Sequence, residues 1–424
     1  MSVVSPRRLL VVPYYYPPFS GSGNRWPTLA RYLRDAGHTV TVVATDAYGR
    51  LDDDDRLGVE RVGDLRSSAL LRMLLRRGRR PQVGETAVER PPGALLTRVL
   101  VPDAHVVAWL PSALFAVRRA LAQSPIDVLV TSSPPESVHL LGLLLGRCRP
   151  AWIADFRDGW RFEPLRPPFP TSPQRRLDTW LERTVARNAD ITLGATKPIA
   201  DDLAGRLGAR AAYVPNAWDP ALTPDAGAAP IADTAGECRI VYTGAFSGVR
   251  GSDPEPLLRA LATVRADAAV RPIRLVLAGP QSDAERSLIE LTGNGDAVSH
   301  VGILPRRDAL ALQRSADALL LLTSRNSSEA TGKLYEYIGA GRPVLALAEG
   351  NEAERIVLET GIGITVPPDD PDAIAASLRR VASGEIADSY APRNLDRFTY
   401  PGPAIAVAEL VEEAIEVHRR RERR

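Results

Sequence analysis

Two glycine-rich loops in the sequence have the composition of phosphate-binding loops. Gly21 and Gly23 come just before a predicted helix, and Gly244 opens a second loop that carries Arg250. Glycines before a helix expose backbone N–H groups at the positive end of the helix dipole, which favours a phosphate or another anion. We therefore predict that both loops approach a phosphate or a reacting anionic group.

A third segment adds a lysine at the start of a predicted helix. Thr331, Gly332 and Lys333 would offer backbone amides and an ammonium group to a diphosphate. Glu336 follows on the same helical face, and its carboxylate could accept two hydrogen bonds from a ribose diol. Lys197 and Lys333 are the only lysines in a chain with 53 basic residues. Each has either survived by chance or has a role that arginine does not fill.

A dense group of charges follows the strand that we predict at Trp152–Ala154. Asp155, Arg157 and Asp158 stand within four positions of one another. The carboxyl end of a strand is where open α/β sheets bind their ligands, so these residues are candidates for a functional role. An Asp–Arg pair that only braces the loop is an equally good interpretation. Asp158 is our candidate for a polar group on the acceptor side.

Two other kinds of site fit the sequence poorly. The first glycine loop lacks the spacing of a dinucleotide turn, because Trp26 replaces its third glycine and eight residues separate Val12 from Gly21. NAD binding is therefore disfavoured, although Asp46 resembles a ribose carboxylate. The acidic run at residues 52–55 lies in a polar loop, and we interpret it as solvated and not as a metal site. We expect neither a metal nor a cofactor.

The overall composition describes an ordinary globular protein. Of the 424 residues, 45% are hydrophobic and 25% charged, and the formal net charge of +2 predicts no nucleic-acid partner. Two distant cysteines and apolar runs too short for a signal peptide or a membrane span predict a cytoplasmic location. The basic stretches at 66–80 and 419–424 are either solvated surface or contacts with the inner face of a membrane.

Short apolar runs alternate with helical patterns, which predicts two parallel sheets covered by helices, an α/β class. A stretch at 221–236, rich in Pro, Gly and Ala, is predicted to be a linker between two domains. The predicted strands before the linker are Leu9–Val12, His38–Ala44, Ile126–Thr131, Trp152–Ala154, Asp190–Leu193 and Ala211–Val214. Those after it are Arg239–Thr243, Ile273–Ala278, Ala318–Leu322, Pro343–Ala346 and Ile362–Val366.

In this arrangement the chain resembles a glycosyltransferase of the GT-B fold, close to the retaining group called family 4. The segments that carry the resemblance span nearly the whole chain and are, in order, 14–25, 132–135, 152–160, 214–216, 242–251 and 332–345. The strings Trp-Ile-Ala-Asp-Phe-Arg-Asp and Gly-Lys-Leu-Tyr-Glu-Tyr are the most specific.

The resemblance implies a division of labour between two Rossmann-like domains whose parallel sheets face each other across a cleft. Residues 1–220 would bind the acceptor and residues 237–400 the nucleotide sugar, while 401–424 would form a helix that returns to the N-terminal domain. The donor would be held by residues from both sides of the cleft, namely Gly21, Gly23, Gly244, Arg250, Thr331, Gly332, Lys333 and Glu336. The nucleotide sugar is a substrate, and the acceptor would be a small molecule, a lipid-linked sugar or a glycan.

Three features of the sequence depart from the family pattern. Ala245 stands where many members have a basic residue, and Glu329 lies one position late for an acidic pair with Glu336. Arg157 and Asp158 replace the catalytic-loop histidine of many members. The candidate catalytic residues are therefore Asp158, Arg157 and Glu329, in a metal-independent transfer of a hexosyl or related sugar with retention of configuration.

Two other functions remain open on the same residues. One is a nucleotide-sugar epimerase of this fold, which would turn over the donor without an acceptor. The other is a non-catalytic relative that binds a partner protein, a reading that Ala245 and the displaced Glu329 allow.

Overall fold

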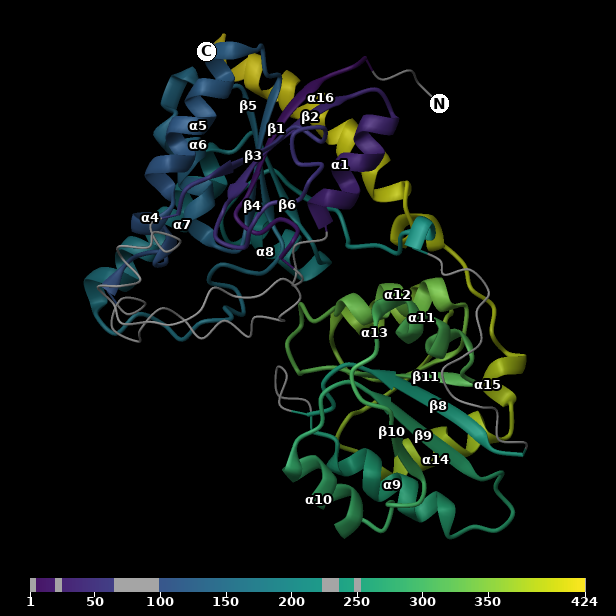
Figure 1. The fold of residues 1–424 in the computed structure, drawn as a ribbon. Helices are drawn as coiled ribbons and strands as arrows, with labels where there is room; N and C mark the ends of the chain where they lie inside the picture. The colour runs from purple at the N-terminus through teal and green to yellow at the C-terminus, as the bar shows by residue number, and fades with distance from the viewer. Residues whose placement is uncertain (1–4, 20–24, 65–98, 223–235, 248–252, 424) are drawn as a thin grey trace. The chain divides into compact units, whose positions relative to one another are not determined.

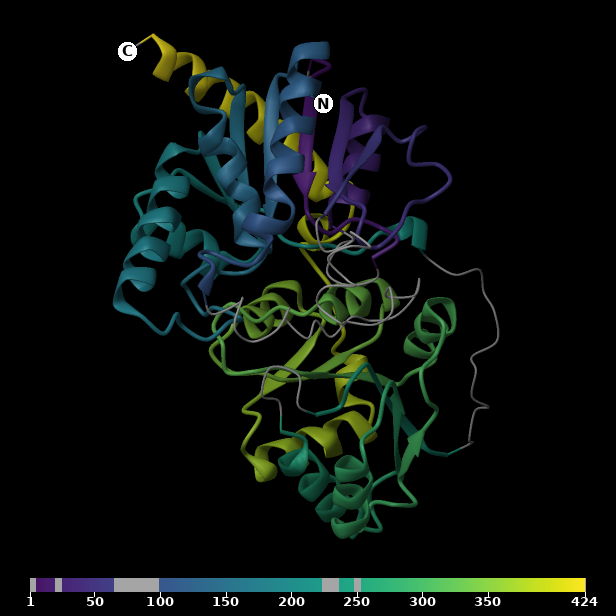
Figure 2. The ribbon, with the colours of Figure 1, turned by 60° about the vertical axis from the view of Figure 1, so that its left-hand side comes forward.

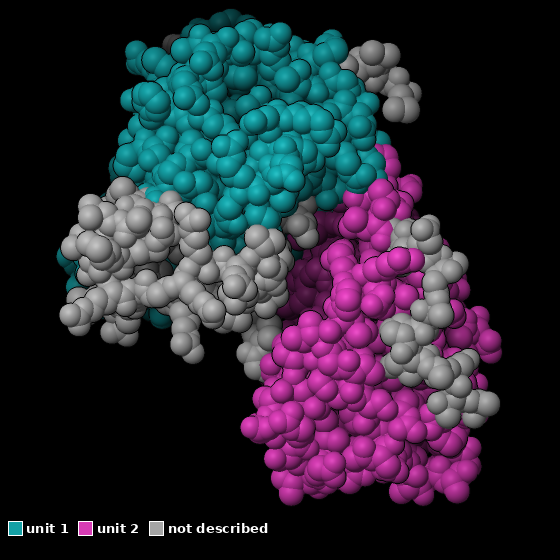
Figure 3. Space-filling model, in the orientation of Figure 1, with its two compact units in different colours: residues 1–215, 403–424 teal, residues 216–402 magenta. Residues whose placement is uncertain are grey.

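The computed structural model describes residues 5–19, 25–64, 99–222, 236–247 and 253–423. The chain forms two compact units, residues 1–215 with 403–424 (unit 1) and residues 216–402 (unit 2), which Figure 3 shows in different colours. Each unit contains one parallel sheet covered by helices (Figure 1), so the predicted α/β class with two Rossmann-like units is confirmed. The predicted linker lies almost wholly outside the described residues.

Unit 1 is built on a seven-stranded sheet with the order β3-β2-β1-β4-β5-β6-β7. All its pairings are parallel, and the central strands are buried over their whole length. The edge strand β3 is a strand that the sequence pattern did not predict. The strands are β1 (Arg8–Pro13), β2 (Thr39–Thr45), β3 (Val59–Val62), β4 (Val128–Ser133), β5 (Ala151–Phe156), β6 (Ile191–Gly194) and β7 (Ala211–Tyr213).

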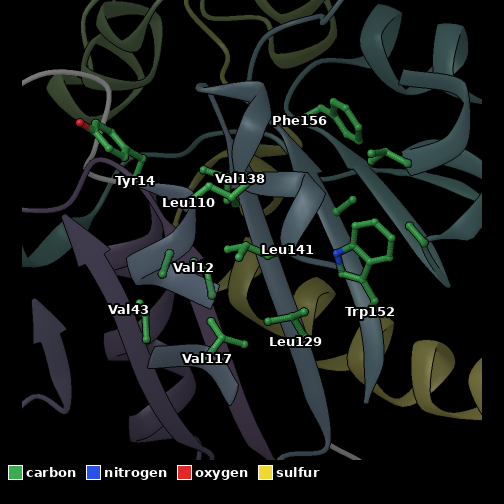
Figure 4. Close-up of a cluster of buried hydrophobic side chains, with 14 of the residues drawn as sticks. Val12, Tyr14, Val43, Leu110, Val117, Leu129, Val138, Leu141, Trp152 and Phe156 are labelled. Atoms are coloured by element: carbon green, nitrogen blue, oxygen red, sulfur yellow. The ribbon is translucent and has the colours of Figure 1, made fainter. Parts of the chain in front are cut away.

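Helices cover both faces of this sheet, and its main core lies beneath α5, α6 and α7. Figure 4 shows part of that core, where Leu129, Leu141 and Trp152 lie among buried apolar side chains. A Cβ at Gly142 would be 2.2 Å from the Trp152 ring, so glycine lets α6 pack closely. The helices are α1 (Arg25–Asp35), α4 (His105–Ala108), α5 (Leu110–Gln123), α6 (Leu140–Leu144), α7 (Ser172–Asn188) and α8 (Lys197–Gly205), with 3-10 turns at Glu136–His139 and Gly146–Cys148.

The C-terminal helix α16 (Gly402–Glu422) belongs to unit 1, where Figure 2 shows it in yellow beside the sheet. Its side chains bond to residues that precede strands. Glu412 accepts from Arg7 Nε at 2.6 Å, and Arg421 donates to Asp190 at 3.0 Å. The C-terminal half of the helix therefore lies near the amino ends of β1 and β6.

Unit 2 is built on a six-stranded parallel sheet with the order β10-β9-β8-β11-β12-β13. Its short edge strand β10 also escaped the sequence pattern. The strands are β8 (Cys238–Thr243), β9 (Ile273–Ala278), β10 (Val298–His300), β11 (Ala318–Leu322), β12 (Val344–Leu347) and β13 (Gly363–Val366). Its helices are α9 (Glu255–Arg265), α10 (Asp283–Leu291), α11 (Arg306–Arg314), α12 (Gly332–Ala340), α13 (Glu352–Thr360), α14 (Pro371–Ala382) and α15 (Glu385–Asp388), with 3-10 turns at Pro220–Leu222 and Leu395–Phe398.

The acidic run at 52–55 differs from the predicted solvated loop at one position. Asp54 is buried and forms an ion pair with Arg61, whose Nε lies 2.8 Å from its carboxylate. Asp53 and Asp55 pair with nearby arginines at the surface. Asp54 thus fastens this loop to β3. The acidic run alone does not reveal this role, because the partner of Asp54, Arg61, lies on β3, which was not predicted.

Within the described residues, no helix is long and apolar enough to cross a membrane.

Candidate functional site

In each unit, the predicted site residues that the structure describes lie at or near the carboxyl ends of central strands. In unit 1, β1 lies between β2 and β4 in the sheet. The strands that follow β1 are first added on one side of it, as β2 and β3, and then on the other side, beginning with β4. In unit 2, β8 stands in the same way between β9 and β11. Such switch points leave a crevice beyond the strand ends, which is where open α/β sheets bind ligands.

The ammonium group of Lys333 lies beside the end of β8. Its Nζ is 5.1 Å from the centroid of the Tyr242 ring, within the range of a cation–π contact. Gly244 follows β8 with φ +116°, and a Cβ there would lie 2.4 Å from Lys333 Cε. Gly279 is equally confined, since its Cβ would be 2.2 Å from the Gly244 carbonyl oxygen. Gly244 therefore leaves room for the cation at the switch point of unit 2, and Gly279 leaves room for the backbone of Gly244.

Helix α12 begins at this cation. Its N-cap residue, Thr331, makes no side-chain capping hydrogen bond. The Oγ1 of Thr331 is buried and has no hydrogen-bond partner among the described residues. The first amides of a helix have no acceptor within the helix, and they carry the positive end of its dipole. The hydroxyl, the amides of Gly332 and Lys333 and the ammonium together form a set of donors suited to a diphosphate.

Glu336 lies one turn further along α12 and is half-buried. Its Oε1 is 2.8 Å from Arg306 Nη1, and Gln313 Nε2 donates to its Oε2 at 3.3 Å. The same Gln313 Nε2 donates to Thr243 Oγ1 at 2.9 Å, so the carboxylate is tied to the end of β8. A carboxylate has about four lone-pair positions, which leaves acceptor capacity for a diol.

Glu329 occupies a different environment from the residues of α12. It is buried, and Ser324 Oγ donates to its carboxylate at 3.2 Å. Its backbone carbonyl accepts from Ala353 N at 2.9 Å. Glu329 therefore links the loop before α12 to the start of α13.

In unit 1, Asp155 is the centre of a fully buried network. Its Oδ2 accepts from Trp26 Nε1 and from Ser132 Oγ, both at 2.8 Å, and its Oδ1 lies 3.3 Å from Arg25 Nη2. Arg25 also donates to the carbonyl oxygen of Val214 at 2.8 Å. The network joins β4, β5 and α1, which is the bracing role that we considered for this charged loop.

Arg157 and Asp158 follow β5 at the surface of this network and are half-buried. The guanidinium of Arg157 donates to the carbonyl oxygens of Ser133 at 2.9 Å and Pro134 at 2.8 Å. Burial lowers the pKa of this guanidinium, against the influence of the carboxylates of Asp155 and Asp158. Arg157 thus holds the Ser-Pro-Pro turn after β4, and Asp158 lies beside it.

Glu136 is a titratable residue in the turn after β4 for which we predicted no role from the sequence. Burial, and next the nearby charge of Asp103, raise its pKa to about 8. Burial alone would also raise the pKa of Asp103, but hydrogen bonds from His105 and from the Ser137 amide lower it. The raised pKa favours the protonated form of Glu136, which can donate a hydrogen bond. Glu136 comes shortly after the carboxyl end of β4, and this position could have marked it as a candidate for a functional role. Its burial could not be predicted, because it depends on residues that are distant in the sequence.

His139 lies fully buried behind the same turn. Trp152 Nε1 donates to Thr131 Oγ1 at 2.9 Å, and this hydroxyl is 2.8 Å from His139 Nδ1. Because the indole can only donate, we assign the hydroxyl proton to the bond with Nδ1. Burial lowers the pKa of His139 to about 3, so the ring is neutral.

Three predicted donor residues, Gly21, Gly23 and Arg250, lie outside the described residues. Among the described ones, no group of three or more His, Cys, Asp or Glu side chains is arranged to hold a metal ion.

Comparison with known proteins gives matches over both units. Residues 20–217 match the family model of the glycosyl transferase 4-like domain, and residues 237–383 match that of glycosyl transferases group 1. No curated protein matches the sequence significantly.

Solved structures resemble the chain over nearly its whole length. Sucrose-phosphate synthase from Thermosynechococcus elongatus is 17% identical with a TM-score of 0.61, covering 96% of this chain and 99% of its own. A protein described as a UDP-N-acetylglucosamine 2-epimerase from Listeria monocytogenes is 13% identical, with a TM-score of 0.56 and 97% of both chains covered. Anabaena HepE in complex with UDP and glucose is 13% identical, with a TM-score of 0.54 and 98% and 99% covered. At such identities the likeness establishes the fold. With the two domain matches, it identifies the chain as a member of the glycosyltransferases of the GT-B fold.

Proposed function

We propose that this glycosyltransferase takes its sugar from a nucleoside-diphosphate donor bound at the end of β8 in unit 2. The observation that carries the proposal is the position of Lys333, whose ammonium lies against Tyr242 and Gly244 at the start of α12. Anabaena HepE, a protein of the same fold, was solved with UDP and glucose. A UDP-sugar is therefore the first donor to test.

In this proposal the donor's diphosphate is held by Lys333, by the amides that open α12 and by Thr331. These groups would stabilise the negative charge that grows on the leaving phosphate. Each fixed donor of this kind is worth on the order of 2–4 kcal/mol in the transition state. Glu336 would accept hydrogen bonds from the ribose, and Glu329 would keep the loop before α12 in place. No metal is required if these groups neutralise the leaving group.

Unit 1 would bind the acceptor at the ends of β4 and β5. Asp158 is the proposed polar group for the acceptor hydroxyl, and Arg157 would fix the loop that carries it, as its bonds to Ser133 and Pro134 suggest. The acceptor oxygen would attack the sugar from the face that the phosphate leaves, which gives retention. The acceptor is a small molecule, a lipid-linked sugar or a glycan, and the two free cysteines suit work in a reducing cytoplasm.

A nucleotide-sugar epimerase is the second candidate, because one such protein shares the fold. The two reactions differ in what they need, since an epimerase converts the donor without an acceptor. Proton NMR of UDP-sugars incubated with the protein separates them. If the protein is a retaining transferase, it should release UDP. With water as a slow acceptor, the free sugar that forms first should have the anomeric configuration of the donor. An inverted product would refute retention, and an epimerised UDP-sugar would favour the alternative.

A further inference from the structure

Helices α5, α6 and α7 lie on the same face of the sheet of unit 1 (Figure 1). Each of them carries at least one exposed apolar side chain. Phe115 on α5 is 69% exposed and Trp180 on α7 is 59% exposed, and Leu144 and Leu177 are exposed as well. Phe115 also lines an open hollow of about 470 Å³ between α5 and the edge strand β3. Leu177 and Trp180 are three residues apart on α7 and therefore neighbours on its surface, and such exposed apolar side chains on neighbouring helices are candidates for an interaction surface.

The exposed charges on the same face are all positive. In α5, α6, the turn at 146–148 and α7, each charged residue that is exposed is an arginine: Arg118, Arg119, Arg147, Arg175, Arg176, Arg183 and Arg187. The two acidic residues of these elements, Asp178 and Glu182, are buried. Asp178 accepts from Trp160 Nε1 at 2.9 Å and Glu182 binds Arg206 at 2.8 Å. Beside the face, Glu60 of β3 also lines the hollow at Phe115, and it forms an ion pair with Arg119. The exposed charges of the three helices and the turn themselves are cations, and their carboxylates are buried.

Several of these arginines are not used by the fold. Among the described residues, no hydrogen bond or ion pair engages Arg147, Arg176 or Arg183. On α7, Arg176 and Arg183 stand on either side of Trp180, at spacings that place all three on one helical face. An amphipathic aromatic ring between guanidinium groups is the composition of a helix surface that lies at a membrane interface.

We infer that the face formed by α5, α6 and α7 binds the surface of an anionic lipid bilayer. Phospholipid headgroups would neutralise the arginines, while Trp180 and Phe115 would enter the boundary between headgroups and acyl chains. Charge complementarity and apolar exposure both favour this contact, which does not depend on the proposed donor site.

This surface differs from the two basic stretches that the sequence singled out. Residues 66–80 lie outside the described residues. In the C-terminal stretch, Arg421 donates to the carbonyl oxygens of Asn188 and Ala189 and to Asp190, so it fastens α16 to unit 1. Arg420 forms an ion pair with Glu416. The C-terminal arginines are therefore partly occupied within the fold.

Trp180 provides a direct probe of this contact. The other five tryptophans, Trp26, Trp109, Trp152, Trp160 and Trp218, are all buried. The full-length protein would be mixed with phosphatidylcholine vesicles with and without phosphatidylglycerol, each containing brominated phospholipid. We expect fluorescence quenching only with the anionic vesicles, reduced by salt and lost in Trp180→Phe. Absence of quenching, or quenching that survives in Trp180→Phe, would overturn the inference.

A charge-matched pair of variants tests the arginines. Neutralising Arg176 and Arg183 together to Gln should lower the vesicle partition coefficient about 25-fold, because one basic residue near such a surface contributes roughly fivefold. The control neutralises two exposed arginines of unit 2, Arg259 and Arg307, and should leave partitioning unchanged. Far-ultraviolet circular dichroism verifies that both variants are folded. Equal partitioning of the two variants would contradict the assigned face.

Discussion

Lys333 occupies the space that a side chain at position 244 would need. A Cβ at Gly244 would come within 2.4 Å of Lys333 Cε and 2.8 Å of Nζ, although one residue follows β8 and the other opens α12. The absence of a side chain at one position thus fixes where the cation of the other can lie. The proposed donor site depends on this relationship.

Replacing Gly244 by alanine should displace the Lys333 side chain and abolish the binding of a nucleoside diphosphate such as UDP. The matched control is Gly302→Ala, because Gly302 also has a positive φ, +76°, but a Cβ there meets nothing within 4 Å. Both variants should lose about 1–2 kcal/mol from the left-handed backbone. Calorimetric titration with UDP would show the difference, and equal affinities in the two variants would separate Lys333 from the proposed site.

Asp158→Asn should lower turnover strongly and leave donor binding almost unchanged. The physical reason is that the side chain is proposed to meet the acceptor, and the amide cannot take up a proton as the carboxylate can. Steady-state kinetics and UDP titration of the same variant measure the two effects. Asp201→Asn on α8, at an exposed carboxylate, is the control. Unchanged turnover in Asp158→Asn would remove this residue from the mechanism.

Asp155→Asn is expected to destabilise unit 1. The substitution removes the charge that faces Arg25, which is buried and would keep an uncompensated cation. Breaking a buried pair in this way costs about 3–5 kcal/mol. Urea unfolding, compared with Asp201→Asn at an exposed pair worth less than about 1 kcal/mol, measures the effect. Similar losses in both variants would show that the network does not hold β4, β5 and α1 together.

His139 should make the stability of the protein depend on pH. Burial lowers the pKa of His139 from 6.5 to about 3, so the folded state favours the neutral ring. Its contribution to the free energy of unfolding is complete above pH 6.5 and is lost as the pH falls towards 3. Between pH 7.5 and pH 5 the loss is about 2 kcal/mol. Measuring the free energy of unfolding of the wild type and of His139→Gln at pH 7.5 and at pH 5 isolates the contribution of His139. An identical pH dependence in the two proteins would contradict the buried neutral ring.

Most strands were predictable because burial on both faces leaves continuous apolar runs. The run Ala318–Leu322, for example, coincides with β11. The two strands that escaped prediction, β3 and β10, are short and lie at sheet edges, where partial exposure removes this signal. Their positions depend on pairing with a neighbouring strand and not on their own composition.

The candidate site was predictable in its residue types but not in its contacts. Glycines and Lys333 carried a local phosphate-binding signal, and the family resemblance related them to one donor. The sequence could not show that Arg157 binds the turn after β4 or that Asp155 is enclosed by Arg25, Trp26 and Ser132, because these partners come from distant segments. The raised pKa of Glu136 was hidden for the same reason.

The most direct test of the account is thermal unfolding with a panel of nucleoside diphosphates on the wild type, Lys333→Ala and Lys197→Ala. Lys197 is the other lysine of the chain, and it forms an exposed ion pair with Asp201 on α8. A ligand at about 100 times its dissociation constant adds roughly 2.7 kcal/mol, which raises the midpoint by a few degrees. We expect one diphosphate to stabilise the wild type and Lys197→Ala but not Lys333→Ala. An equal shift in Lys333→Ala, or none in the wild type with any diphosphate, would contradict it.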